Sequence, residues 1–179
     1  MYLKQRGHFS KVSWRRLICN NNGLPKWIFI MFLAAHRRLQ TRDRLRRWGC
    51  VEDDTCLLCN TEVQTTDHLF FTCSFCAQIW TAMLEWMRIY RQVMTWEHEL
   101  KWVEQRCRGR SANAEIYKMM LAGSIYYIWQ ERNARVFQAT QRNAEIITRL
   151  LVQDLHCRGN VKQRLKGRLL ELNYYPNVH

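Results

Sequence analysis

The sequence is poor in the two residues that most often interrupt helices, with two prolines and seven glycines among 179 residues. A turn-rich β architecture uses more of both. It also lacks a long apolar run, since the most apolar stretch, residues 27–35, is much shorter than the roughly 20 residues of a membrane-spanning helix. No apolar segment follows the first residues, so no signal peptide is predicted. These absences favour an intracellular protein, nuclear or cytoplasmic, without a membrane partner.

Acidic side chains are scarce in the first third of the chain. Residues 1–50 hold 12 lysines and arginines against one acid, Asp43, whereas residues 51–110 carry a net charge of −3 and residues 111–179 a net charge of +5. A strongly basic segment beside an acidic one predicts a polyanionic partner, most simply RNA or DNA. The eight cysteines are expected to be reduced thiols and metal ligands, because disulfides belong to secreted proteins.

Apolar residues recur at helical spacing along most of the chain, and nearly half of all residues are hydrophobic. Helices are predicted over residues 26–39, 42–48, 74–90, 95–106, 111–137, 142–156 and 161–173. The last of these is the least certain in type, because alternating basic residues also fit a strand or coil. The predicted fold class is mainly α, a helical domain with a small zinc lobe.

The composition divides the chain into three regions. Residues 1–25 are predicted to be irregular, residues 26–92 to form the zinc-binding domain, and residues 93–179 to form a helical C-terminal region. The zinc-binding region contains the strongest chemical motif of the sequence.

That motif is Cys56-x2-Cys59-x8-His68-x4-Cys73. Two cysteines separated by two residues form a turn that aims both sulfurs at one point, and a histidine and a cysteine five apart can face the same point. Four such ligands are typical of a closed, structural Zn²⁺ site with no open position for water. We therefore predict that Cys56, Cys59, His68 and Cys73 bind Zn²⁺, with Thr66 capping the helical turn that carries His68.

Other cysteines leave alternatives open. Cys76 lies three residues after Cys73 and could replace one ligand, although a place in the core of the following helix is favoured. Cys50 is a weaker contender. Three cysteines have no partner at ligand spacing and are predicted to be buried thiols: Cys19, Cys107 and Cys157.

The order of several motifs resembles the zinc-binding domain that follows the polymerase in plant LINE-type (non-LTR) retrotransposon reverse transcriptases. The resemblance covers roughly residues 12–90 and rests on Leu24-Pro25-Lys26, Phe29 to Phe32, His36 to Thr41, Leu45, Cys56-Leu57-Leu58-Cys59, Glu62, Asp67 to Phe71, Cys73 and Trp80. Ile128-Trp129, Glu131-Arg132-Asn133 and Phe137 resemble a helical segment found downstream in such chains. The resemblance places the family's metal ligands on the same four residues.

The chain departs from those full-length proteins in its catalytic parts. It has no Tyr-x-Asp-Asp motif, and the basic C-terminal third does not offer the several acids of an RNase H site. The resemblance thus implies an accessory module without polymerase or RNase H parts, which could contact a reverse transcriptase or another retroelement protein. No nucleophile–base pair stands out either, so no enzyme activity and no catalytic residue are predicted.

Nucleic-acid contact is predicted for six arginines within eleven residues: Arg37, Arg38, Arg42, Arg44, Arg46 and Arg47. Phosphate binding is favoured over a merely solvated surface, whereas Trp48 beside them is predicted to be core rather than a platform for a base. The leading functional hypothesis is a zinc-stabilised nucleic-acid-binding module. The alternatives are a protein-interaction scaffold using Trp- and Met-rich helices, and a decayed retroelement fragment.

Overall fold

The computed structural model describes residues 15–19 and 21–172, and all regular elements in this part of the chain are helical. The sole β feature there is an isolated antiparallel bridge between Thr55 and Val63. The mainly α prediction is confirmed. Most of residues 1–25, which were predicted to be irregular, lie outside the described residues, and residues 15–19 form the short helix α1 (Arg15–Cys19).

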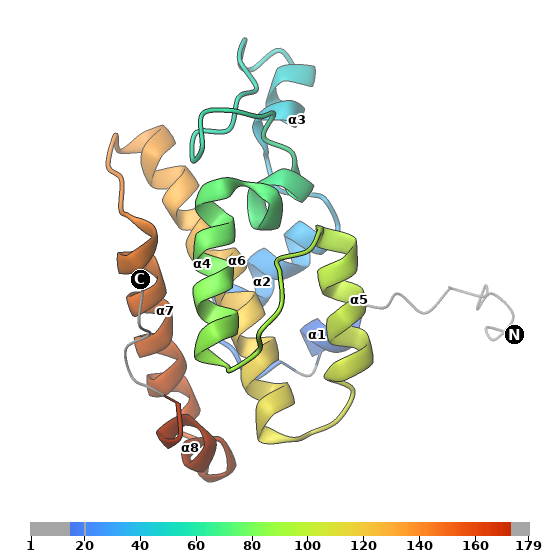
Figure 1. Ribbon diagram of the computed structural model, residues 1–179. Helices are drawn as coiled ribbons and strands as arrows, with labels where there is room; N and C mark the ends of the chain where they lie inside the picture. The colour runs from blue at the N-terminus through green and yellow to red at the C-terminus, as the bar shows by residue number, and fades with distance from the viewer. Residues whose placement is uncertain (1–14, 20, 173–179) are drawn as a thin grey trace, which may run out of the picture.

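The fold is built around α6 (Ala112–Phe137), the longest helix. Helices α2 (Pro25–Ala35), α4 (Ser74–Trp86) and α7 (Ala144–Gly159) pack against α6 (Figure 1). Trp27 of α2 is fully buried against Gly123 of α6, where an added Cβ would lie 3.3 Å from the Trp27 ring and 2.5 Å from Leu151 of α7. A glycine at this position lets three helices approach closely.

Side-chain caps begin two of the helices, and the starts of α5 and α6 lie within one residue of the predicted ones. The Ser111 hydroxyl accepts a hydrogen bond from the Ala114 backbone N–H and begins α6, and Thr95 precedes α5 (Trp96–Arg106). The Asn143 side chain caps α7 by accepting from the Ile146 N–H at 2.8 Å. The segment with alternating basic residues is the helix α8 (Gln163–Leu170), because Leu165 and Leu169, four residues apart, are both buried.

Two predicted helices are shorter than the periodicity suggested. The helix predicted to end at residue 39 ends at Ala35, and the one predicted to end at residue 90 ends at Trp86. In both cases the chain turns sharply two residues beyond the end, where Arg37 and Arg88 adopt positive φ angles of 52° and 59°. The apolar residues that follow pack as loop residues.

The predicted ligands lie in a lobe at one end of the helical body, at the top of Figure 1. This lobe comprises α3 (Arg42–Arg47), the turns of residues 50–65 and the π-helical turn η1 (His68–Thr72), which leads into α4. The C-terminal end of α6 reaches the lobe, while α8 and the α5–α6 loop lie at the opposite end. The predicted regions 26–92 and 93–179 therefore share one core through α2, α4, α6 and α7. Within residues 15–19 and 21–172, no helix has the length and apolar character that crossing a bilayer requires.

Candidate metal centre

Cys56, Cys59, His68 and Cys73 converge on one point. Their sulfur and nitrogen ligand atoms all lie within 4.8 Å of one another. The Cys56 and Cys73 sulfurs are 3.9 Å apart, and the Cys59 sulfur is 3.3 Å from Nε2 of His68. With Zn–S bonds of about 2.3 Å and a Zn–N bond of about 2.0 Å, a tetrahedral ion needs S–S separations of about 3.8 Å and S–N separations of about 3.5 Å. The four residues fit Zn²⁺.

The first pair of ligands is held by a tight turn. The Cys56 N–H donates to the Glu62 carbonyl at 2.7 Å, and the neighbouring Thr55–Val63 bridge closes the loop between them. Asn60 takes a positive φ of 58°, which Asn tolerates better than most residues. The turn directs the backbone N–H groups of Leu58 and Cys59 at the Cys56 sulfur.

The second pair is placed by the turn η1. The Thr65 hydroxyl accepts a hydrogen bond from the His68 N–H at 3.0 Å, so the capping role predicted for Thr66 falls to Thr65. The π-helical winding carries the chain from His68 to Cys73, whose N–H donates to the His68 carbonyl at 2.8 Å. Between the ligands, Leu69, Phe70 and Phe71 are buried and anchor the lobe on the helical core.

The environment of His68 suits binding through Nε2. This nitrogen faces the sulfurs, while Nδ1 lies 3.2 Å from Oε2 of Glu62. This contact is a close approach and not an aligned hydrogen bond, and the buried Nδ1 has no other hydrogen-bond partner among the described residues. A carboxylate at the second ring nitrogen of a metal-bound histidine fixes its tautomer and orientation. Glu62 is therefore placed to orient His68.

Two of the thiols hold their protons tightly before metal binding. The hydrogen bond that the Cys56 thiol donates to Cys73, together with burial, raises the pKa of Cys56 to about 12. The same contact lowers the pKa of Cys73, but its interaction with Cys76 and its burial outweigh this and raise the pKa to about 12. Both groups are thiols at neutral pH and must lose protons to become ligands.

Zinc uptake is therefore expected to release at least two protons per chain at pH 7. Each released proton changes the apparent affinity about tenfold per pH unit, so lowering the pH from 7 to 6 should weaken zinc binding roughly 100-fold. Isothermal titration calorimetry in buffers of different ionisation enthalpy measures this proton count. A proton release near zero would mean that Cys56 and Cys73 are not both ligands.

The comparison with protein families agrees with this geometry. Residues 1–80 match the family described as zinc-binding in reverse transcriptase. The match ends at Trp80, within α4. No curated protein and no solved structure matches the chain. The match confirms the predicted resemblance over residues 1–80 and supports zinc as the metal; the narrower likeness to plant LINE-type elements stays a prediction.

The remaining cysteines of this zinc-binding protein do not join the cluster. Cys76 is buried in α4 beside Cys73, and Cys50 is exposed, its sulfur 3.9 Å from the Trp48 carbonyl. The prediction that three partnerless cysteines are buried is right for Cys107 and wrong for Cys19 and Cys157, which are exposed. Each of these two lies at or near the end of a helix, where periodicity says little about burial.

Four of the six clustered arginines of the zinc-binding domain make ion pairs inside the lobe. Arg42 pairs with Asp53 and Arg46 with Asp54, in the turn that leads to Cys56. Arg37 pairs with Asp67 beside His68, and Arg47 with Asp43 one helical turn before it. These pairs are largely exposed and each contributes at most about 1 kcal/mol. Together they brace the loops that carry the ligands.

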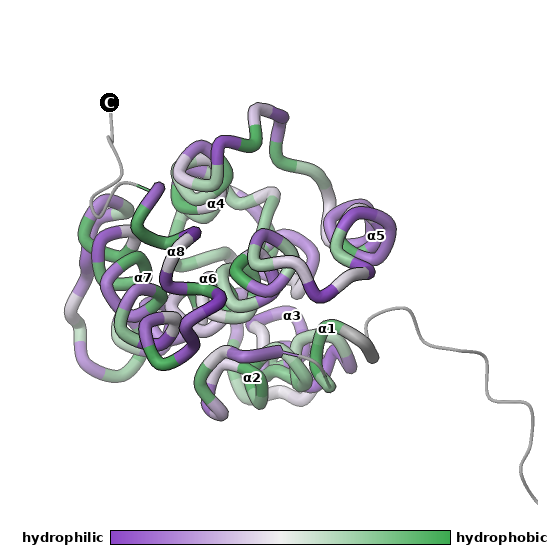
Figure 2. The backbone as a smooth tube through the Cα atoms, turned by 90° about the horizontal axis from the view of Figure 1, so that it is seen from below, coloured by the Kyte–Doolittle hydropathy of each residue, from purple (hydrophilic) through white to green (hydrophobic). Residues whose placement is uncertain are grey.

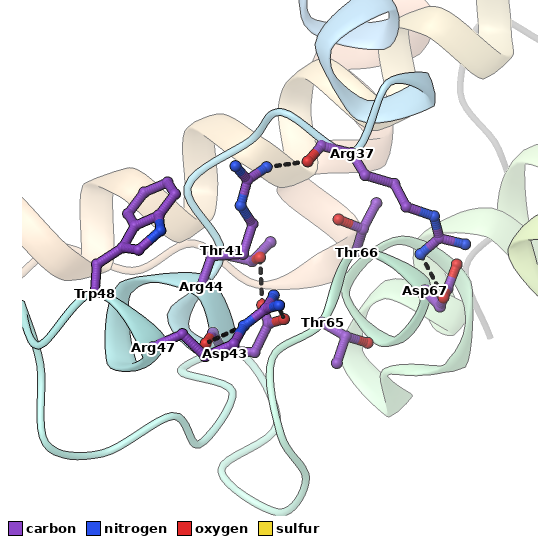
Figure 3. Close-up of a pocket in the computed structure, with 9 residues that line it drawn as sticks. All are labelled: Arg37, Thr41, Asp43, Arg44, Arg47, Trp48, Thr65, Thr66 and Asp67. Atoms are coloured by element: carbon purple, nitrogen blue, oxygen red, sulfur yellow. Dashed lines mark hydrogen bonds and ion pairs between the residues drawn. The ribbon is translucent and has the colours of Figure 1, made fainter.

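The other two arginines have no carboxylate partner among the described residues. Arg38 is exposed, and Arg44 donates to the Arg37 carbonyl while its guanidinium stacks on Trp48, 4.9 Å from the ring centroid. Trp48 is 55% exposed, so its prediction as a core residue is wrong. It follows directly after α3, a helix that has no buried residue and therefore does not pack against the core. Trp48, Arg44 and Arg47 border a hollow of about 500 Å³ between α3 and η1, closed by Thr65 and Asp67 (Figure 3).

A side chain at the C-terminal end of α6 binds the knuckle, the turn of residues 56–59 that carries the first two cysteine ligands. Arg135 donates from Nη1 to the carbonyls of Leu57 and Leu58, the two residues between the cysteines, at 3.1 and 3.3 Å. Its guanidinium also pairs with the fully buried Glu131, which binds Arg142 as well. The turn that holds Cys56 and Cys59 is thus fastened to a helix nearly 80 residues away in sequence.

Arg132, one residue after Glu131, is 2% exposed and has no carboxylate partner in the described chain. Its Nε–H donates to Oε1 of Gln64 at 3.0 Å and its Nη2–H to the Gln40 carbonyl at 2.9 Å. The Gln64 amide in turn lies 3.8 Å from the Cys56 sulfur. Burial lowers the pKa of Arg132 to about 10, which leaves it charged at neutral pH.

A buried cation without a counter-ion is costly. Three thiolates and a neutral imidazole around Zn²⁺ carry a net charge of about −1, and this anion would lie one glutamine away from Arg132. Sequence reasoning placed Arg132 in a downstream helix but gave no sign of this contact, because nothing local links positions 64 and 132.

Proposed function

We propose that this protein is a zinc-stabilised module, associated with a reverse transcriptase, that binds single-stranded RNA or DNA. Zn²⁺ would hold the loops of the lobe in place and have no catalytic role, since four protein ligands leave no coordination position for a substrate. The observation that carries the proposal is the exposed Trp48 with Arg44 stacked on it, at the edge of a hollow beside the metal centre.

The chemistry of this hollow suits one unpaired nucleotide. An exposed indole offers a flat face on which any base can stack, and stacking needs no base-specific hydrogen bonds. Arg44 and Arg47 both lie on the same side of Trp48 in the close-up and can reach the phosphate of a nucleotide whose base stacks on that ring (Figure 3). Such a site binds single strands and has little preference for sequence.

The ion pairs of the lobe leave two of the six clustered arginines available to phosphate without competition from a carboxylate. Arg38 and Arg44 lack carboxylate partners among the described residues, whereas the other four arginines must share their charge with an aspartate. We therefore expect Arg38 and Arg44 to dominate phosphate binding at this lobe. The paired arginines would contribute mainly by holding the loops in shape.

Binding of a labelled single-stranded oligonucleotide, measured by fluorescence anisotropy, tests the proposal. We expect the affinity to fall steeply with salt, because each phosphate contact on a single strand contributes about 0.7 to the logarithmic slope. Trp48→Ala should weaken binding by about 1–3 kcal/mol, the value of one base stacked on an aromatic ring, and leave the salt slope unchanged.

Phe137→Ala is the matched control, since Phe137 is also a largely exposed aromatic residue on the surface. It should bind as the unmodified protein does. Equal losses from the two substitutions would remove Trp48 from the site, and the absence of binding at 50 mM salt would refute nucleic-acid binding altogether.

The scaffold alternative loses its proposed surface. It relied on Trp80, Met83, Trp86, Met87, Trp96 and Trp102 to hold a partner. The first five are buried in the core, and Trp102 lies under the guanidinium of Arg91, 4.6 Å from the ring centroid. These residues support the fold and are not available for docking.

A further inference from the structure

A second basic hollow lies at the end of the molecule opposite the zinc lobe. It is bordered by the end of α4, the end of α5, the start of α6 and α8, and its volume is about 440 Å³. Apolar side chains, among them Met87, Ile89 and Cys107, line its floor, and three arginines stand on its walls: Arg88, Arg106 and Arg168. Figure 2 looks onto this end of the molecule, with α8 beside α6 and α5 across from them.

The positive charge of this hollow is little compensated. Arg168 pairs with Glu171, but Arg88 donates to the backbone carbonyl of the same glutamate and has no carboxylate of its own among the described residues. Arg106 and Arg110 are exposed, and their side chains make no hydrogen bond or ion pair within the described residues. This is the reverse of the zinc lobe, where most arginines are paired.

The α5–α6 loop, which follows Arg106 and contains Arg110, packs over a third positively charged side chain. Lys118 of α6 is 5% exposed, and its ammonium lies 3.4 Å from the Gly109 carbonyl, under the loop between α5 and α6. The same loop leads into the N-terminus of α6, a helix of 26 residues whose dipole adds partial positive charge at this point. Glu115 in the first turn of α6 does not offset this charge, because it is paired with Arg164.

These observations favour a phosphate group as the ligand. We propose that this arginine hollow, distinct from the zinc lobe, binds the phosphodiester backbone of the nucleic acid; the inference rests on the nucleic-acid binding proposed above. The two aromatic residues that line the hollow offer no free ring, because Arg91 covers Trp102 and Tyr117 is buried. The contact would therefore be to phosphates and would position the strand without reading its sequence.

The test compares two double variants that lose the same charge. Arg106→Gln/Arg110→Gln changes the hollow and its loop at two side chains that make no hydrogen bond within the described chain. Lys101→Gln/Lys166→Gln is the control, because both lysines are exposed, line neither hollow and make no side-chain hydrogen bond or ion pair within the described chain. Each is titrated with the same 30-nucleotide single strands, RNA and DNA, over a range of salt concentrations.

We expect the Arg106/Arg110 variant to reduce the logarithmic salt slope by about 1.4 and the affinity at 0.1 M salt on the order of 25-fold, as the loss of two phosphate contacts requires. The control should change neither by more than about twofold. Equal losses in both variants would overturn the inference, since net charge alone would explain them.

Comparing the unmodified protein with the Arg106/Arg110 variant separates the second site from the proposed function. If the unmodified protein binds with a steep salt slope and the Arg106/Arg110 variant matches it, the strand contacts the zinc lobe alone and the second site is refuted. If the unmodified protein binds neither strand at low salt, both proposals fall.

Discussion

Removal of zinc is expected to unfold the lobe that contains α3 and η1 and to lower the melting temperature of the whole protein. Residues 60–67, between Cys59 and His68, are mostly polar, and metal binding supplies on the order of 10 kcal/mol to small sites of this kind. Arg132 and Arg135 of α6 bind residues of the lobe, so unfolding of the lobe also removes contacts made by the main helical core. Thermal unfolding before and after chelation, with native mass spectrometry to count the metal, measures the effect.

Substitution of one ligand should reproduce chelation. Cys59→Ser is expected to weaken zinc binding by far more than the roughly 10- to 100-fold that outer-shell changes cause. Cys157→Ser, at an exposed cysteine on α7, is the control and should retain one zinc per chain. A Cys59→Ser protein that still holds zinc tightly and melts like the unmodified protein would contradict the assignment of this residue.

Arg132→Met is expected to weaken zinc binding about 10- to 100-fold and to destabilise the zinc-bound protein by several kcal/mol. The substitution leaves the buried Oε1 of Gln64 without its donor, at about 1–3 kcal/mol, and also removes the hydrogen bond to the Gln40 carbonyl. It also removes the buried cation closest to the negative metal cluster. Denaturant unfolding and competition with a chromophoric chelator measure the two effects separately.

The loss of stability caused by Arg132→Met is expected to depend on zinc, and this dependence tests the role of the charge most directly. After chelation, Arg132 is a buried charge without its counter-ion, so the same substitution should cost less than it does with zinc present. Arg132→Lys separates charge from shape, because lysine keeps the charge but cannot make the same pair of directed bonds. Equal destabilisation with and without zinc would show that Arg132 serves packing alone.

The parts of the site that were predicted from sequence are those set by local spacing. Four ligands within eighteen residues are recognisable by their chemical type and separation, and the start of α6 follows from the cap at Ser111. Helix ends were predicted less well, because the turns at Arg37 and Arg88 depend on positive φ angles that no sequence pattern announced.

Features that depend on distant partners could not be predicted. The ion pairs of Arg37, Arg42 and Arg46 were not predicted, because their aspartate partners lie in other loops of the lobe. Trp48 fitted a helical face, yet α3 is a short helix with no buried residue, so this face meets no core. The same distance in sequence concealed the contacts of Arg132 and Arg135 with the knuckle.

The family match stops at Trp80, inside α4, while the knuckle is secured from α6. The structural unit is therefore larger than the matched segment, because the loop with Cys56 and Cys59 is held by a side chain of α6. We expect chains that keep Cys56 and Cys59 to keep guanidinium groups at the positions of Arg132 and Arg135 as well. An alignment of relatives in which chains keep both cysteines but lack arginine at these two positions would contradict this expectation.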